Sequence, residues 1–308
     1  MAYQALADVM TTQPWRGPAA AAALLLAIAS PGSAQRLLEW PVRTAPGAEA
    51  LVGGAAAAFW NPAAVASPAA PRGEAMALDI EGSEAVGIRG VALAGSFRLG
   101  ARTVVMGGYN HLGIPDIPHT EDSPVPSALR PSIDVGGDLF TLGAAREVAS
   151  TWWIGGTLRY WRESAGTFHR DHGLGAGIGF AYRAASPFRP SLAAAVFTGR
   201  AEPRWLAGTE VSTPAVAGTR ELRLSLGYGV AGGEAPRTVA HRISATSRWA
   251  DVLTLSAGVD LEPDPGFAVI EPVLAASVRL GRYRLGVLRE EIANGFGAAY
   301  YYRFHVTF

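Results

Sequence analysis

The chain has 308 residues, with 26 Lys and Arg against 26 Asp and Glu, so its formal net charge at pH 7 is zero. Balanced charge gives no electrostatic basis for binding nucleic acid. The sequence has no cysteine, which excludes disulfides, thiolate metal sites, a cysteine nucleophile and a lipid-modified cysteine anchor. Its 37 glycines suit a protein of many strands and tight turns.

The first segment is typical of an export signal. An apolar run, residues 19–29, follows Arg16 and precedes Gly32-Ser33-Ala34. A helix that spans a bilayer needs about 20 apolar residues, so this run is too short for an anchor, and the small residues after it match a signal-peptidase site. We predict a cleaved signal peptide over residues 1–34. Later stretches are also too short and too charged for an inner-membrane helix.

From residue 74 onward, apolar and polar side chains alternate in segments of about ten residues, which is the pattern of a transmembrane barrel. The clearest segments are 221–230, 174–183 and 253–261. In each, one face is apolar and the other is polar or glycine-rich. The pattern predicts an all-β protein, a transmembrane antiparallel β-barrel over residues 74–308.

A direct count of these segments gives about thirteen strands, but single-chain bacterial barrels have an even number. Long outer loops are expected at 110–135 and 163–172, and Pro272 is expected to delay its strand to Val273. Counting turns from both ends shows that one strand is missing between 200 and 218, and 204–211 is the best candidate. The prediction is therefore about 14 strands.

The last strand, residues 296–308, carries aromatic and apolar side chains at every second position. They are Tyr300, Tyr302, Phe304, Val306 and Phe308. This ending resembles the C-terminal strand by which bacterial outer-membrane barrels are recognised. The resemblance implies that these residues are a barrel-assembly signal, that the assembly machinery and outer-membrane lipid are partners, and that the chain resides in the bacterial outer membrane.

The segment before the strands, 35–73, has no sustained period. It contains Gly53-Gly54-Ala55 and, a few residues later, Phe59-Trp60-Asn61-Pro62-Ala63. These elements resemble the PorV/PorQ family of outer-membrane proteins and, more distantly, the FadL-type transporters of hydrophobic compounds. The resemblance implies an N-terminal plug or hatch whose element is Gly53, Gly54, Trp60, Asn61 and Pro62. Asn before Pro also favours a turn, so a simple kink that leads the chain into the barrel is the plainer explanation.

The polar strand faces are predicted to point into the lumen, because an arginine on the lipid face costs about 2–4 kcal/mol near the midplane. We expect their charged side chains to form ion pairs and hydrogen bonds that fill the lumen. The lumen-facing set is Asp79, Arg98, Arg159, Arg183, Glu221, Arg223, Arg242, Arg248, Asp260, Arg279, Arg284 and Arg303.

Three functions remain open. A PorV/PorQ-like protein would serve type IX secretion and bind secretion components or cargo proteins. A FadL-like protein would passively transport hydrophobic small molecules, although an arginine-lined lumen favours anionic or water-soluble cargo unless the route is lateral. A barrel enzyme is disfavoured, because no Gly-x-Ser-x-Gly element is present. His169 and His172 have metal-like spacing but lie in a polar segment, so we predict no catalytic residue, metal or cofactor.

Overall fold

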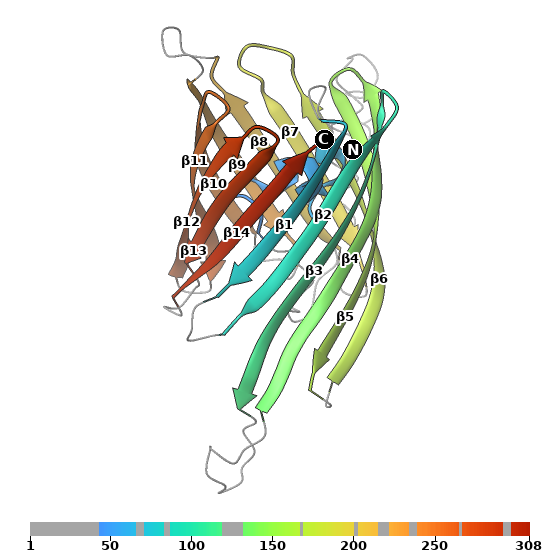
Figure 1. Cartoon of the computed structure of the whole chain (residues 1–308), viewed down its shortest axis with the longest axis vertical. Helices are drawn as coiled ribbons and strands as arrows, with labels where there is room; N and C mark the ends of the chain where they lie inside the picture. The colour runs from blue at the N-terminus through green and yellow to red at the C-terminus, as the bar shows by residue number, and fades with distance from the viewer. Residues whose placement is uncertain are drawn as a thin grey trace, which may run out of the picture.

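The computed structural model describes residues 43–65, 71–82, 87–118, 132–166, 169–199, 203–214, 222–233, 239–264, 267–291 and 297–308. The predicted signal peptide, 1–34, and the predicted lumenal residue Glu221 lie outside these ranges. The described strands form one closed antiparallel barrel of fourteen strands, in which β14 pairs with β1 (Figure 1). The predicted fold class is confirmed.

Three short 3-10 helices precede the wall: η1 (Glu49–Leu51), η2 (Gly54–Ala58) and η3 (Pro62–Val65). The strands are β1 (Gly73–Glu81), β2 (Arg89–Leu99), β3 (Thr103–Pro118), β4 (Ser132–Ala149), β5 (Trp152–Ala165), β6 (His169–Arg183), β7 (Ser191–Thr198), β8 (Arg204–Ser212), β9 (Leu222–Gly232), β10 (Ala240–Trp249), β11 (Leu253–Asp264), β12 (Phe267–Leu280), β13 (Tyr283–Glu291) and β14 (Ala298–Thr307). No helix in the described part of the chain is both long and apolar enough to cross a membrane.

The strand predicted at 204–211 from the count of turns is present. β8 covers Arg204–Ser212 and pairs with β7 on one side and β9 on the other. Its inward residues Arg204 and Leu206 are buried. An even count is required because each hairpin returns the chain to the same side of the membrane.

Several loop predictions are wrong, because strands continue through the residues assigned to loops. β3 runs to Pro118 and β4 begins at Ser132, so only part of 110–135 connects them. β5 and β6 likewise extend through most of 163–172. β12 begins at Phe267 and includes Pro272, which pairs with Val259. In Figure 1, β3 to β6 project beyond the other strands at the end away from the C-terminus.

A polar cluster on the outer face explains this extension. The Asp138 carboxylate accepts a hydrogen bond from the Tyr109 hydroxyl at 2.7 Å, lies 2.9 Å from His111 Nδ1, and pairs with Arg162. Such groups are costly in hydrocarbon, so the apolar belt ends near this level. Beyond the apolar belt, the ends of β3 to β6 can carry polar side chains on both faces. These ends therefore lack the alternation of apolar and polar residues by which strands were predicted.

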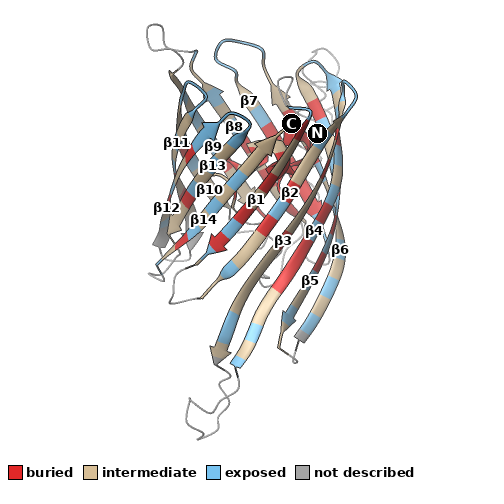
Figure 2. Cartoon of the chain, viewed as in Figure 1, coloured by how far each residue is buried: buried red, intermediate tan, exposed pale blue. Residues whose placement is uncertain are grey.

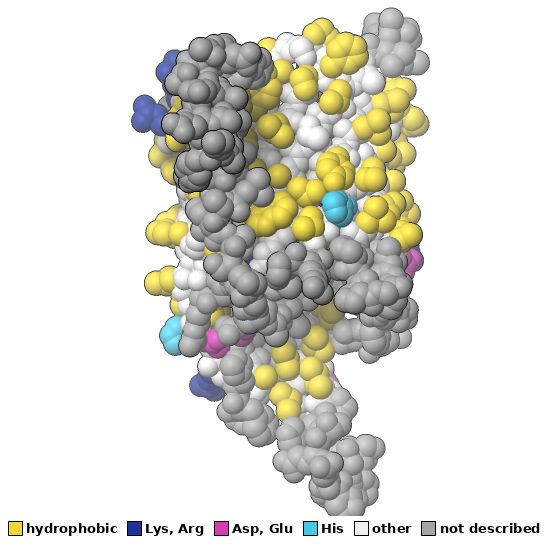
Figure 3. Space-filling view, turned by 180° about the vertical axis from the view of Figure 1, so that it is seen from behind, with side chains coloured by type: hydrophobic (Ala, Val, Ile, Leu, Met, Phe, Trp, Pro, Cys, Tyr) yellow, Lys and Arg dark blue, Asp and Glu magenta, His cyan; other side chains and the backbone are white. Residues whose placement is uncertain are grey.

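The wall has an apolar outer face. Leu224 and Leu226 are 45% and 68% exposed, and Leu158 on β5 is 66% exposed, because they point away from the lumen. Figure 3 shows hydrophobic side chains spread over the described surface, with charged groups near its margins. The protein therefore presents hydrocarbon to its surroundings over most of the wall.

The prediction that Asp79 faces the lumen is wrong. Met76, Leu78 and Ile80 on β1 are buried, and Asp79 alternates with them, so it lies on the outer face opposite Val91 and Tyr302. The prediction assumed that every polar face points inward. On β1 the inward face is mostly apolar because it packs against the N-terminal segment inside the barrel.

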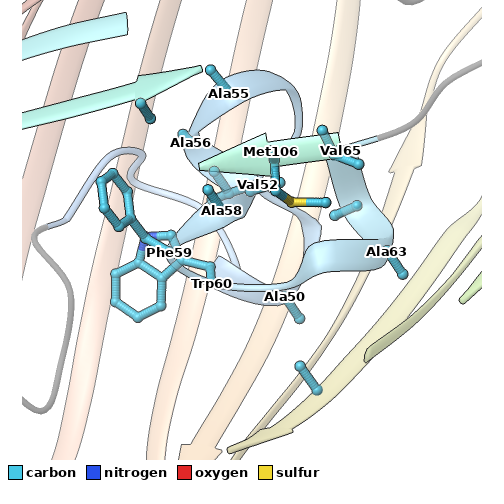
Figure 4. Close-up of a cluster of buried hydrophobic side chains, with 14 of the residues drawn as sticks. Ala50, Val52, Ala55, Ala56, Ala58, Phe59, Trp60, Ala63, Val65 and Met106 are labelled. Carbon is cyan, nitrogen blue, oxygen red and sulfur yellow. The ribbon is translucent and has the colours of Figure 1, made fainter. Parts of the chain in front are cut away.

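The N-terminal segment 43–65, hereafter the hatch, fills part of the lumen. Its helices contact β1 to β8, and its residues join wall residues such as Met106 in one buried apolar cluster (Figure 4). Phe59 and Ala63 are fully buried. Figure 2 shows buried stretches on the strands that surround the hatch. Because η1 to η3 lie against one arc of the wall, the lumen is divided into a packed side and a side with open space.

Candidate functional site

The side chain of Asn61 joins three parts of the molecule. Its Nδ2 donates to the Ala50 carbonyl at 2.8 Å within the hatch and to the Phe180 carbonyl at 3.1 Å on β6. Its Oδ1 accepts from the Ala63 amide at 3.0 Å. Asn61 is fully buried, so each bond replaces one that water would otherwise make. The Asn-Pro-Ala element thus fixes the hatch to the wall.

Wall glycines make room for this element. A Cβ at Gly179 would lie 2.0 Å from Asn61 Oδ1, and a Cβ at Gly155 would lie 2.8 Å from the Ala63 amide nitrogen. Gly108 is similarly close to the Phe59 ring. Gly155 and Gly179 are cross-strand partners on β5 and β6. Together they form a flat patch on which the turn at Pro62 rests.

Gly54 in the hatch element is a glycine for a different reason. Its φ is +66°, a left-handed conformation that favours glycine, and a Cβ there would lie 2.3 Å from the Glu74 carboxylate. That carboxylate accepts from the Ala55 amide at 3.2 Å and lies 2.8 Å from His305 Nδ1. Glu74 of β1 and His305 of β14 therefore hold η2 at the seam where the barrel closes.

Arginines from the wall bind carbonyls of the hatch. Arg159 donates to the Phe59 carbonyl, and its guanidinium lies 3.7 Å from the Phe197 ring centroid. Arg183 donates to the Ala64 carbonyl at 3.0 Å, and Arg303 donates to the Thr44 carbonyl. The short helices cannot satisfy these carbonyls themselves, so guanidinium groups complete their hydrogen bonding.

The first described residue, Arg43, anchors the start of the hatch. It pairs with Asp260 and, at 3.0 Å, with Glu290. Burial lowers the pKa of Arg43, but the charges of Glu290 and Asp260 outweigh that effect and its pKa is raised. Arg242 pairs with both Glu49 and Asp260. The hatch is thus tied by ion pairs to β10, β11 and β13.

One acidic cluster has the spacing of metal ligands. Single oxygens of Asp260, Glu271 and Glu290 lie within 4.8 Å of one another. Arg43 and Arg242 already bind two of these carboxylates, and the Tyr301 hydroxyl donates to Glu290 at 2.8 Å. The cluster serves as the anchor of an ion-pair network.

A cavity of about 400 Å³ lies between the hatch and the wall. The hatch contributes residues 44–48, 51–54 and Ala56 to its lining. The wall contributes Glu74, Glu210, Ser225, Gly227, Ser244, Thr246, Arg248, Thr254, Ser256, Ala275, Ala276, Ser277, Arg284, Arg303 and His305. Six of these wall residues are serine or threonine, and the small side chains on β9 to β12 keep the lumen open where the hatch helices do not pack.

A second, larger depression lies on the outer face over β8 to β13. Its volume is about 980 Å³, and it is lined by apolar side chains such as Leu224, Leu255, Leu274 and Val287. The cavity and this outer groove share five lining residues: Ser225, Thr246, Ser256, Ala275 and Ala276. At these positions the wall is a single layer of backbone with short side chains.

The structure brings many of the sequence-predicted lumenal residues to the hatch. Arg159, Arg183 and Arg303 bind its carbonyls, and Arg242 and Asp260 belong to the ion-pair network. Arg248 and Arg284 line the cavity. The others sit nearer the rim: Arg98 donates to the Ala101 carbonyl, Arg279 to the Gly281 carbonyl, and Arg223 pairs in register with Arg248.

Sequence reasoning missed Arg43, Glu49, Glu74, Glu290 and Tyr301. Glu74, Glu290 and Tyr301 occupy inward positions of their strands, so their parity was a usable signal. Arg43 and Glu49 lie in a segment without periodicity, and only the folded structure shows their partners.

A closed antiparallel barrel with an apolar outer face is the architecture of transmembrane β-barrels, and here the hatch occupies part of its lumen. No family model and no curated protein matches the chain. Among solved structures, the toluene transporter TbuX of Ralstonia pickettii aligns with a TM-score of 0.59 at 12% identity, over 83% of this chain and 94% of that chain. The toluene transporter TodX of Pseudomonas putida aligns with a TM-score of 0.50 at 12% identity, over 85% and 96%. These likenesses show that the chain shares the β-barrel fold of these two proteins.

Proposed function

We propose that this protein is a passive transporter that admits small hydrophobic compounds through the outer membrane. The observation that carries the proposal is the shared wall between the lumenal cavity and the outer groove. A compound that enters the cavity is separated from the lipid-facing groove by a single layer of backbone with the short side chains of β9 to β12. The hatch blocks the direct axial route because its helices are packed and hydrogen bonded to the wall.

The toluene transporters of the same fold support this proposal, since the cargo for which they are named is a hydrophobic small molecule. A lateral route also suits such cargo, because a hydrophobic compound leaves the barrel directly into hydrocarbon and avoids the polar lumen on the far side of the hatch. The fold alone does not assign cargo, so the wall residues must be tested.

The test is uptake of radiolabelled toluene by cells that express the full-length protein in place of their own outer-membrane channels. Ala275→Phe would fill the cavity from inside, and Ala276→Phe would fill the groove from outside. Both should reduce the protein-dependent uptake rate by about tenfold. Ala144→Phe, an outward substitution on β4, is the matched control and should leave uptake unchanged. Uptake that is equal with and without the protein would refute the proposal.

A secretion-associated role of PorV/PorQ type is the second candidate. The observation that favours it is the projection of β3 to β6 beyond the rest of the wall, which offers a raised, partly polar rim to an exported protein. A pull-down of the detergent-solubilised protein from its own membrane tests this role. Recovery of secretion components or cargo proteins would favour it over small-molecule transport.

A further inference from the structure

The cavity beside the hatch carries positive charge that the described residues do not neutralise. Arg248 of β10, Arg284 of β13 and Arg303 of β14 all line it. In the described ranges, none of the three has a carboxylate oxygen within 4 Å, whereas Arg43 and Arg242 each have two carboxylate partners. Nε of Arg248 is buried without a hydrogen-bond partner. The charges of Arg248 and Arg279 repel that of Arg284, while the more weakly acting Glu74 and Asp251 attract it.

The acidic groups of the cavity are already engaged. Glu74 accepts the Ala55 amide and contacts His305, and Glu210 attracts both Arg248 and Arg183. Three arginines against these two carboxylates leave the lining with one more basic than acidic side chain, His305 apart. Uncompensated charge inside a low-dielectric wall is costly, and an anionic ligand would relieve that cost.

The lining residues other than the arginines indicate the size and polarity of the uncharged part of such a ligand. Leu51, Val52 and Ala56 of the hatch present a small apolar surface, while Thr254 and Ser277 supply hydroxyl groups beside the arginines. Pockets for small molecules usually measure about 300–1,000 Å³, and this cavity lies at the lower end of that range. The lining therefore fits a compact molecule with a charged end and a short hydrocarbon body.

We propose that the cavity binds a small organic carboxylate, either monoaromatic or short-chain, with its carboxylate between Arg248 and Arg284. This inference rests on the proposed transport function and adds compact organic acids to the neutral hydrocarbons as its cargo. A guanidinium binds a carboxylate through paired hydrogen bonds, and a neutral hydrocarbon gains nothing from either arginine.

The first test measures binding of benzoate, toluene and inorganic phosphate to the detergent-solubilised full-length protein by calorimetry. Benzoate should bind, and Arg248→Gln and Arg284→Gln should each weaken it about tenfold, the loss expected for one charge-assisted hydrogen bond. Arg248→Lys and Arg284→Lys keep the charge and should restore most of the affinity. Arg98→Gln removes an identical charge near the rim on β2, outside the cavity lining, and should have no effect.

Variants are compared only after heat-dependent gel mobility shows that each barrel is folded. Benzoate binding that is insensitive to both Gln substitutions would overturn the proposal, as would phosphate binding as strong as that of benzoate. Failure of the two ideas is distinguishable. Protein-dependent toluene uptake without benzoate binding would support the transport function and contradict the carboxylate site. Benzoate binding without uptake of either compound would support the carboxylate site and contradict the transport function.

Discussion

The two sides of the lumen are built differently. On the side of β1 to β8, inward residues such as Ala92, Met106 and Ala193 are buried against the hatch helices. On the side of β9 to β13, inward residues such as Ser256 and Ser277 face a cavity. We call these the packed side and the open side.

The difference separates two tasks. On the packed side, apolar burial and glycine patches hold the hatch in one position, because close packing tolerates few alternatives. On the open side, the start of the hatch is held by ion pairs, by the Arg303 hydrogen bond and by its close approach to Gly229 and Gly258 of the wall. A plug can thus stay fixed in the barrel while a space remains beside it.

Asn61→Ala should produce the largest effect on the packed side. It leaves the Ala50 and Phe180 carbonyls and the Ala63 amide without partners, and each buried unpaired group costs about 1–3 kcal/mol. We expect a loss of about 3 kcal/mol or more in the free energy of unfolding, measured by guanidinium titration in micelles. Limited proteolysis should also cut the hatch faster. Asn61→Asp keeps the acceptor but places an oxygen against the Ala50 and Phe180 carbonyls, so it should lose at least as much; a smaller loss would contradict the role of Nδ2.

Arg43→Gln tests the tether on the open side. Glu290 keeps Tyr301 and Asp260 keeps Arg242, so only the hydrogen bonds of Arg43 are lost. We expect about 2 kcal/mol of destabilisation, from the magnitude of a charged hydrogen bond. The double variant with Asn61→Ala should show additive losses if the two sides act independently. A coupling above about 1 kcal/mol would show that the sides form one unit.

Gly179→Ala tests the packed side through the wall instead of the hatch. The new methyl group would meet Asn61 Oδ1, and overpacking of this kind costs about 1–3 kcal/mol. Gly156→Ala is the matched control, since its Cβ would lie 3.6 Å from the nearest atom, the Gly177 carbonyl oxygen. The two variants are compared by guanidinium midpoint and by the rate of hatch proteolysis. Equal midpoints would mean that the hatch does not depend on this contact.

The contrast between the sides also explains what the sequence could predict. The period of two and the parity of turns located the wall, including β8, because every strand must alternate and every hairpin must return. The same rule failed at Asp79, where the hatch makes the inward face of β1 apolar. It also failed near Asp138, where the strands continue beyond the apolar belt.

The site was less predictable than the wall. The Asn61-Pro62-Ala63 motif was visible in the sequence. The wall residues that it contacts, on β5 and β6, are more than ninety residues away in the chain. Inward arginines could be expected from parity. Which of them bind the hatch, as Arg159 does, and which face the cavity, as Arg284 does, depends on where the hatch lies.

The smallest expected effect concerns a turn on the open side, where no hatch contact can compensate. Ala250 and Asp251 connect β10 to β11 with φ of 49° and 52°, and Val252 donates to the Trp249 carbonyl across the turn. Left-handed alanine is strained, so Ala250→Gly should stabilise the barrel by about 0.5–1 kcal/mol. Gly281→Ala, at φ 63° in the β12–β13 turn, should destabilise it by a similar amount. Guanidinium midpoints that move in the same direction for both variants would show that backbone strain in these turns does not determine the stability of the barrel.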